Sequence, residues 1–145
     1  MADPFSVASG AIGIISLGIE VSGRIVSYCQ AWQDYGDDIQ RFGAKADSVR
    51  TLLKRVRELL EEIRITDPEI AGDMERTVAD LQMKVEQLHE TLQRYRPALD
   101  SGPKRLRTQL KKAAHPFRKD TLNKMWHDLD DMEQSLQIAL NLLRA

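Results

Sequence analysis

Residues 39–63 read IQRFGAKADSVRTLLKRVRELLEEI, a stretch in which apolar residues recur in alternating steps of three and four. This spacing is typical of one face of an α-helix, which makes a turn about every 3.6 residues. The face is wide enough to pack against two neighbouring helices rather than one. We expect a helix over residues 38–65, with Asp37 and Asp38 as candidate caps. Its apolar residues are Ile39, Phe42, Ala46, Val49, Leu52, Leu53, Val56, Leu59, Leu60 and Ile63.

The same alternation returns in two stretches on the C-terminal side. Asp67 and Pro68 separate the first of them from the preceding helix, because Asp67 can cap a helix and Pro68 suits a first helical position. We expect helices over residues 68–98 and 118–144. Their apolar faces are Val78, Leu81, Val85, Leu88, Leu92, Tyr95 and Leu99 in the first, and Leu122, Met125, Leu129, Met132, Leu136, Ala139 and Leu143 in the second.

Two further helices complete the predicted fold. One covers residues 5–32, and a short basic one covers residues 104–114 and stops before Pro116. No stretch alternates with a period of two, so the sequence predicts no strand. The fold class is therefore all-α. We expect a single domain over residues 1–145, a bundle of four to five helices in which long antiparallel helices are joined by short turns.

Composition and motifs argue against an enzyme. The chain has a net charge of −1 and one cysteine, Cys29, so no internal disulfide can form and a reducing compartment is favoured. Glu86 and His89 have the spacing found in bundle di-iron sites, but such a site needs a second copy, and lysines stand three residues before the other histidines. No Ser-His-Asp arrangement follows from spacing. We expect no catalytic residue, no metal and no cofactor.

The first segment differs chemically from the others. Residues 5–19 comprise nine apolar residues, three glycines and three serines, and no polar face is evident before Glu20 and Arg24. A helix that is apolar all round is either sheathed by neighbours or destined for lipid. The uncharged run of sixteen residues from Pro4 to Ile19 falls short of the roughly 20 that span a bilayer, so we expect no permanent anchor.

A basic segment follows the third predicted helix. No acidic residue lies between Asp100 and Asp120. Three interpretations stay open: a solvated helix face, attraction to anionic lipid headgroups, and nucleic-acid binding, which the lack of interleaved aromatic residues disfavours. The basic residues are Lys104, Arg105, Arg107, Lys111, Lys112, Arg118 and Lys119.

The N-terminus carries a family resemblance. Residues 1–21 read MADPFSVASGAIGIISLGIEV, and Tyr28 and Trp32 follow. The chain resembles the fungal HeLo-like N-terminal domain of signal-transducing NTPases with numerous domains. Residues 115–119, His-Pro-Phe-Arg-Lys, resemble the family's Trp-Pro-Phe-Lys-Lys motif, with His115 standing where Trp is frequent. The resemblance covers essentially the whole chain, and the opening motif is its most specific part.

The resemblance implies a membrane-targeting effector of fungal NOD-like receptors, active in innate immunity, programmed cell death and heterokaryon incompatibility. Such a domain would oligomerise, move from the cytoplasm to the plasma membrane, and release its first helix into the bilayer, similar to the mixed-lineage kinase domain-like pseudokinase and plant resistosome domains. Its partners would be further copies of the chain, anionic lipids, and C-terminal NTPase and repeat regions. Nucleic acid is not among them.

Under this interpretation three sets of residues have distinct roles. The residues entering the membrane would be Phe5, Ile12, Ile14, Ile15, Leu17 and Ile19; those allowing close helix–helix approach would be Ser9, Gly10, Gly13 and Gly18; and the basic residues above would contact anionic lipid. The alternative is a non-enzymatic helical adaptor or oligomerisation domain that never contacts lipid. It explains the apolar first helix as ordinary core.

Overall fold

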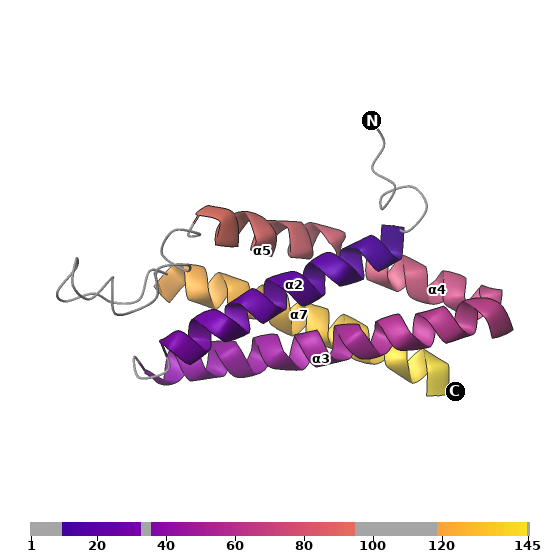
Figure 1. Cartoon of the computed structure of the whole chain (residues 1–145), viewed down its shortest axis with the longest axis horizontal. Coiled ribbons are helices and arrows are strands. Elements are labelled where there is room, and N and C mark those ends of the chain that lie inside the picture. Colours follow the sequence, from indigo (N-terminus) through magenta and orange to yellow (C-terminus); the bar gives the residue numbers. More distant parts are fainter. Residues whose placement is uncertain (1–9, 33–35, 95–118, 145) are drawn as a thin grey trace.

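The computed structural model describes residues 10–32, 36–94 and 119–144. Every regular element in these ranges is an α-helix, which confirms the predicted all-α bundle (Figure 1). The predicted short helix over residues 104–114 lies outside the described residues, as does the end of the predicted 68–98 helix. The elements are α2 (Gly10–Ala31), α3 (Asp37–Thr66), α4 (Pro68–Ala79), α5 (Gln82–Arg94) and α7 (Lys119–Arg144).

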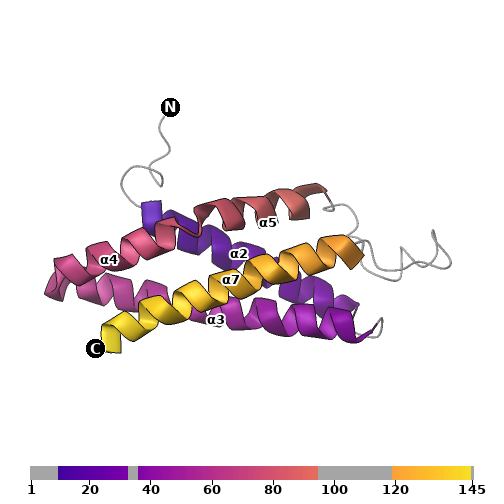
Figure 2. The same ribbon diagram turned by 180° about the vertical axis from the view of Figure 1, so that it is seen from behind.

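The helices form four rods, because α4 and α5 follow one another along the same side of the bundle (Figure 1). Helices α2 and α3 run antiparallel, and the chain reverses again at Asp67 to enter α4. Helix α2 lies against α3, α4 and α5 on one side of the molecule. Helix α7 lies against the same three helices on the opposite side, which Figure 2 shows from behind.

Helices α3 and α7 are parallel neighbours. Lys45 and Ser48 of α3 contact Asp130 and Glu133 of α7, in each case across a separation of 85 residues. A constant separation along two helices means that they run in the same direction. No local pattern indicated this pairing, because the two helices are far apart along the chain.

The predicted apolar faces form the core. On α3 the side chains from Ile39 to Leu60 that follow the alternation are all buried, and Ile63 is partly buried at the end of the helix. The periodicity therefore located the inward side of each long helix correctly. The other helices contribute Met74, Val78, Leu81, Val85, Leu88 and Leu92, followed by Leu122, Met125, Leu129, Met132, Leu136 and Ala139.

The prediction of one continuous helix over residues 68–98 is wrong. The helix is interrupted at Asp80 and Leu81, where the N–H of Leu81 donates to the carbonyl of Val78 at 2.9 Å. This bond spans three residues and tightens the turn. Val78 and Leu81 both stay buried, so the rod bends without moving its apolar stripe away from the core. Neither glycine nor proline marks the break, and the local sequence therefore does not reveal it.

The helix caps agree only in part with expectation. Asp67 caps α4 as predicted, since its carboxylate accepts from the N–H of Ile70 at 3.2 Å and Pro68 occupies the first turn. At α3 the cap residue is Gly36, with φ of 135°, and no side chain makes a capping hydrogen bond. Asp37 and Asp38 lie inside the first turn instead, where negative charge favours the helix dipole.

Replacing Gly72 by alanine should stabilise the bundle. Gly72 lies within α4, and a Cβ built on it meets no atom within 4 Å. A helical glycine without a packing role costs about 0.5–1 kcal/mol relative to alanine, so Gly72→Ala is expected to raise the free energy of unfolding by that amount. Urea denaturation measures it. A lower free energy of unfolding for this variant would contradict the placement of Gly72 in an open helical position.

Candidate functional site

Helix α2 is packed by one face only. Ile15 and Ile25 have no exposed surface, and they point between α3 on one side and α4 and α5 on the other. The buried positions recur in steps of three and four and so follow one face of the helix. They are Ala11, Ile15, Gly18, Val21, Ser22, Ile25, Tyr28 and Cys29.

The opposite face of α2 corrects the expectation of a helix that is apolar all round. Ser16, Glu20 and Ser27 are exposed, and Gly13 lies half-exposed beside them. Glycine and serine are nearly neutral in hydropathy, so the hydropathy pattern of the sequence did not predict this exposed face. Helix α2 is thus a peripheral member of the bundle and is not sheathed on every side.

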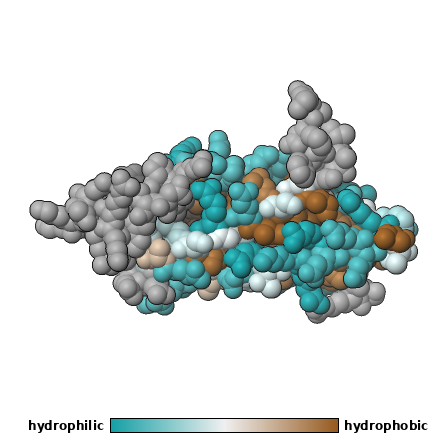
Figure 3. All heavy atoms as spheres, viewed as in Figure 1, coloured by the Kyte–Doolittle hydropathy of each residue, from teal (hydrophilic) through white to brown (hydrophobic). Residues whose placement is uncertain are grey.

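Apolar side chains border this outer face. Ile12, Ile14, Leu17 and Ile19 are only partly buried, although all four pack against the core. Figure 3, viewed as Figure 1 with α2 in front, shows hydrophobic patches along the N-terminal half of this helix. Of the predicted membrane-entering residues, only Ile15 is fully buried, and Phe5 lies outside the described residues.

The length of α2 also changes the assessment of the segment. The helix runs for 22 residues, so it continues well beyond the uncharged stretch that ends at Ile19. Within the described part of the chain, α2 is the one helix long and apolar enough to cross a membrane by length and composition. Core helices of soluble proteins can meet the same criterion. The expectation that the segment is too short to span a bilayer therefore no longer holds on length alone.

Two glycines allow α2 and α3 to approach closely. A Cβ on Gly18 of α2 would lie 2.8 Å from Leu53 Cδ1, and a Cβ on Gly43 of α3 would lie 2.8 Å from Cys29 Cβ. Both distances are shorter than van der Waals contact permits, so each glycine makes room for the other helix. Gly18 therefore has a packing role inside the monomer, whereas Gly10 has nothing within 4 Å. Close approach of these residues between copies stays a prediction, and Ser9 is outside the described residues.

Two polar side chains on the buried face of α2, Ser22 and Cys29, are accommodated locally. The Ser22 hydroxyl donates to the carbonyl of Gly18 at 2.6 Å, and the carbonyl of Ile19 is 3.2 Å away. Burial raises the pKa of the Cys29 thiol to about 12, so the thiol is protonated at neutral pH. Cys29 behaves as a small apolar residue, in agreement with its buried position on α2 opposite Gly43 of α3.

A polar network, the α3–α7 clasp, joins the two parallel helices. Lys45 Nζ lies 2.8 Å from Asp130 Oδ1 and 2.8 Å from Glu133 Oε1, and the Ser48 hydroxyl donates to Glu133. The ring of Trp126 covers the ammonium group at 4.8 Å. The hydrogen bond from Lys45 lowers the pKa of both carboxyls, and the bond to Asp130 raises the pKa of Lys45. Sequence inspection missed this network because its members are so widely separated.

The α3–α7 clasp predicts a pH dependence of stability. The pKa of Glu133 in the folded chain is below its ordinary value of 4.5, so its contribution is present above pH 4.5 and is lost as pH falls through the lowered pKa. The pKa of Lys45 is above 10.5, so its contribution is present below pH 10.5 and is lost at higher pH. The free energy of unfolding is expected to fall on both sides of this window.

Urea denaturation across pH, with Glu133→Gln beside the parent chain, tests this dependence. The variant should lose part of the decline below pH 4.5, because glutamine does not titrate. Glu61→Gln, at an exposed position on α3, makes the same chemical change away from the α3–α7 clasp and should retain the decline. If the free energy of unfolding falls equally below pH 4.5 in the parent and in Glu133→Gln, the α3–α7 clasp does not contribute to this pH dependence.

The predicted basic segment is almost entirely outside the described residues. Lys119 is the exception, and it is exposed at the first residue of α7. In the described ranges no three His, Cys, Asp or Glu side chains gather closely enough to hold a metal ion. The other predicted lipid-contacting residues fall outside those ranges, and they are Lys104, Arg105, Arg107, Lys111, Lys112 and Arg118.

Comparison with known proteins gives one informative likeness. No protein-family model and no solved structure matches the chain. The chain is 25% identical over 150 residues to the azaphilone pigments biosynthesis cluster protein L of the fungus Monascus ruber. The alignment covers 95% of this chain but only 30% of that protein. The all-helical chain is therefore distantly similar to part of a longer fungal protein and is compatible with a HeLo-like domain.

Proposed function

We propose that this chain is a membrane-targeting effector domain of a fungal NOD-like receptor, acting in cell death and innate immunity. It oligomerises and releases α2 into the membrane. The observation that carries the proposal is the combination found in α2: a length and composition sufficient to cross a bilayer, in a helix held at the edge of the bundle by one face. The resemblance of the N-terminus to HeLo-like domains supports the same assignment.

The packing of α2 explains why release would need a trigger. Exposing Ile15, Val21 and Ile25 to water would cost about 1.5–3 kcal/mol each, so an isolated domain keeps the helix in place. A bilayer offsets this cost, because the side chains exchange a protein interior for lipid. Glu20 and Arg24 stand four residues apart, so they can pair on one side of the helix when it is in the membrane.

The proposed setting is the cytoplasm, with relocation to the plasma membrane on activation. The protonated, buried Cys29 thiol is compatible with a reducing compartment. Proposed partners are further copies of the chain and anionic lipids. A C-terminal NTPase or repeat region, which the resemblance to HeLo-like domains implies, is a further proposed partner. No catalytic role, metal or cofactor is part of the proposal.

Vesicle leakage with anionic lipids tests insertion of α2. Leu17 is partly exposed, so Leu17→Lys should fold, yet a lysine in the membrane is less favourable than leucine by about 3 kcal/mol. We expect insertion, and leakage with it, to fall by about two orders of magnitude. Ile138→Lys on α7 introduces the same charge at a position that is 60% exposed, and this variant should cause as much vesicle leakage as the parent chain. Equal leakage from both variants would exclude α2 as the inserting element.

A second function, that of an adaptor which never contacts lipid, is favoured by one specific observation. The close packing at Gly18 and Gly43 seats α2 firmly against α3, as in an ordinary core. An adaptor would oligomerise equally well without membranes. Sedimentation of the purified domain with and without anionic vesicles separates the two functions: an unchanged oligomer that stays in the supernatant supports the adaptor, and co-sedimentation supports the effector.

A further inference from the structure

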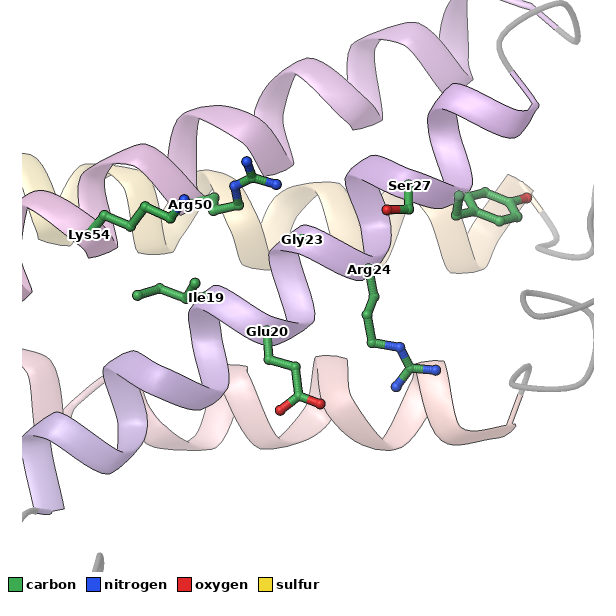
Figure 4. Close-up of a pocket in the computed structure, with 8 residues that line it drawn as sticks. Ile19, Glu20, Gly23, Arg24, Ser27, Arg50 and Lys54 are labelled. Atoms are coloured by element: carbon green, nitrogen blue, oxygen red, sulfur yellow. The ribbon is translucent and has the colours of Figure 1, made fainter.

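A solvent-open groove lies between α2 and α3, on the side of the bundle away from α7. We call it the α2–α3 groove, and its volume is about 490 Å³. Gly23 of α2 lies at its centre, with Arg24 and Ser27 from the same helix and Arg50 and Lys54 from α3 around it (Figure 4). The volume is within the range of sites that hold small ligands.

The α2–α3 groove has an excess of positive charge. Three cations, Arg24, Arg50 and Lys54, and a single carboxylate, that of Glu20, line it. Arg50 and Lys54 lie along α3, while Arg24 and Glu20 extend from the other side of α2 (Figure 4). Across the described ranges, the ion pairs join other residues, and none involves these three cations. Both arginines are half-buried, and a guanidinium that is partly removed from water without a counter-charge is unfavourable. The groove therefore favours an anion.

The arrangement of the side chains suits a small, multiply charged oxyanion. Figure 4 shows Arg50 extending from α3 toward Gly23, while Lys54 lies one turn away on the same helix. A Cβ on Gly23 would be 3.7 Å from Arg50 Nη1. Because glycine has no side chain, the Arg50 guanidinium stays accessible to a ligand in the groove. Arginine binds phosphate through two parallel N–H donors, and the Ser27 hydroxyl adds a further donor at the same site.

We propose that the α2–α3 groove binds a phosphate monoester. Its charge of about −2 at neutral pH matches the net charge of the three cations and Glu20. Because Arg50 and Lys54 belong to α3 while Ser27 belongs to α2, the bound phosphate ties the two helices together. The phosphate belongs either to a soluble metabolite or to a lipid headgroup. This inference rests on the groove alone and stands whether or not α2 enters membranes.

The test uses the full chain labelled with ¹⁵N and titrated with glycerol 3-phosphate. We expect saturable shifts of the Gly23 and Ser27 amide signals. Arg50→Gln should weaken binding about tenfold or more, as expected for loss of a charged hydrogen-bond donor. Arg55→Gln removes the same charge from an exposed position of α3 outside the groove and should bind as the parent does. Arg24→Gln provides a second variant within the groove.

Two results would overturn the proposal: shifts confined to residues 104–119, or equal weakening in Arg50→Gln and Arg55→Gln. Vesicles then identify the source of the phosphate. Binding to vesicles with phosphatidic acid, a monoester, in preference to phosphatidylserine, a diester, assigns a lipid headgroup when Arg50→Gln reduces it and Arg55→Gln does not. Saturation by glycerol 3-phosphate without such vesicle binding assigns a soluble metabolite. Absence of binding to every probe would also overturn the proposal.

Discussion

Oxidised Gly43→Cys protein is expected to lose vesicle leakage completely and to regain it on reduction. Cys29 is the one native cysteine, and a Cβ at position 43 lies 2.8 Å from its Cβ. Disulfides need a Cβ–Cβ distance of about 3.5–4.5 Å, so a separation of the helices by about 1 Å would suffice to form the bond. The disulfide would link α2 covalently to α3 and prevent its release.

The measurement compares dye leakage from anionic vesicles for the oxidised and reduced forms of this one variant. Gly43→Ala is the matched control, since it introduces the same close Cβ without a thiol and should be insensitive to reductant. Overpacking at this position costs about 1–3 kcal/mol, which the control reports separately. Leakage that is equal in the oxidised and reduced forms would show that release of α2 is not required.

Ile15→Lys should strongly destabilise the domain, whereas Leu17→Lys should not. Ile15 has no exposed surface, so the substitution would bury an unpaired ammonium group and disturb the core. The expected loss is about 4 kcal/mol or more, a large part of the roughly 5–15 kcal/mol that is typical of a domain. Leu17 is partly exposed, and the lysine stem can reach water from there.

Circular dichroism during urea denaturation measures both variants. Ile15→Ala serves as the control for lost packing without a buried charge, and about 2–5 kcal/mol of destabilisation is expected for it. Stability of Ile15→Lys equal to that of Leu17→Lys would contradict the seating of α2 against α3, α4 and α5. The comparison also identifies Leu17 as the position at which insertion can be tested in a folded chain.

The long helices and their inward faces followed from the sequence. The predicted 38–65 and 118–144 helices differ by one residue at most from the ends of α3 and α7. Asp67 and Pro68 likewise identified the start of α4. These features are local: a helical repeat and a cap depend on residues within a turn or two of one another, and the sequence displays them directly.

The exposure of the outer face of α2 could not be predicted from the local sequence. Gly13 and Ser16 provide a nearly neutral surface, and neighbouring helices determine which of the surrounding isoleucines are covered. The sequence predicts close helix–helix approach at Gly18, and within the monomer this glycine makes room for Leu53 of α3. A glycine's role depends on what lies opposite it, and that partner belongs to the next helix, far beyond the reach of a helical repeat.

What the sequence alone determined is the all-α class, the amphipathic rods and the unusual chemistry of the first segment. Only the tertiary structure decided that α3 and α7 are parallel, that the rod bends at Asp80 and Leu81, and that Arg24 and Arg50 line one groove. The physical reason is the range of the interactions. Hydrophobic periodicity fixes which side of a helix turns inward, but neighbours, directions and charge clusters arise from contacts between distant segments that no local pattern encodes.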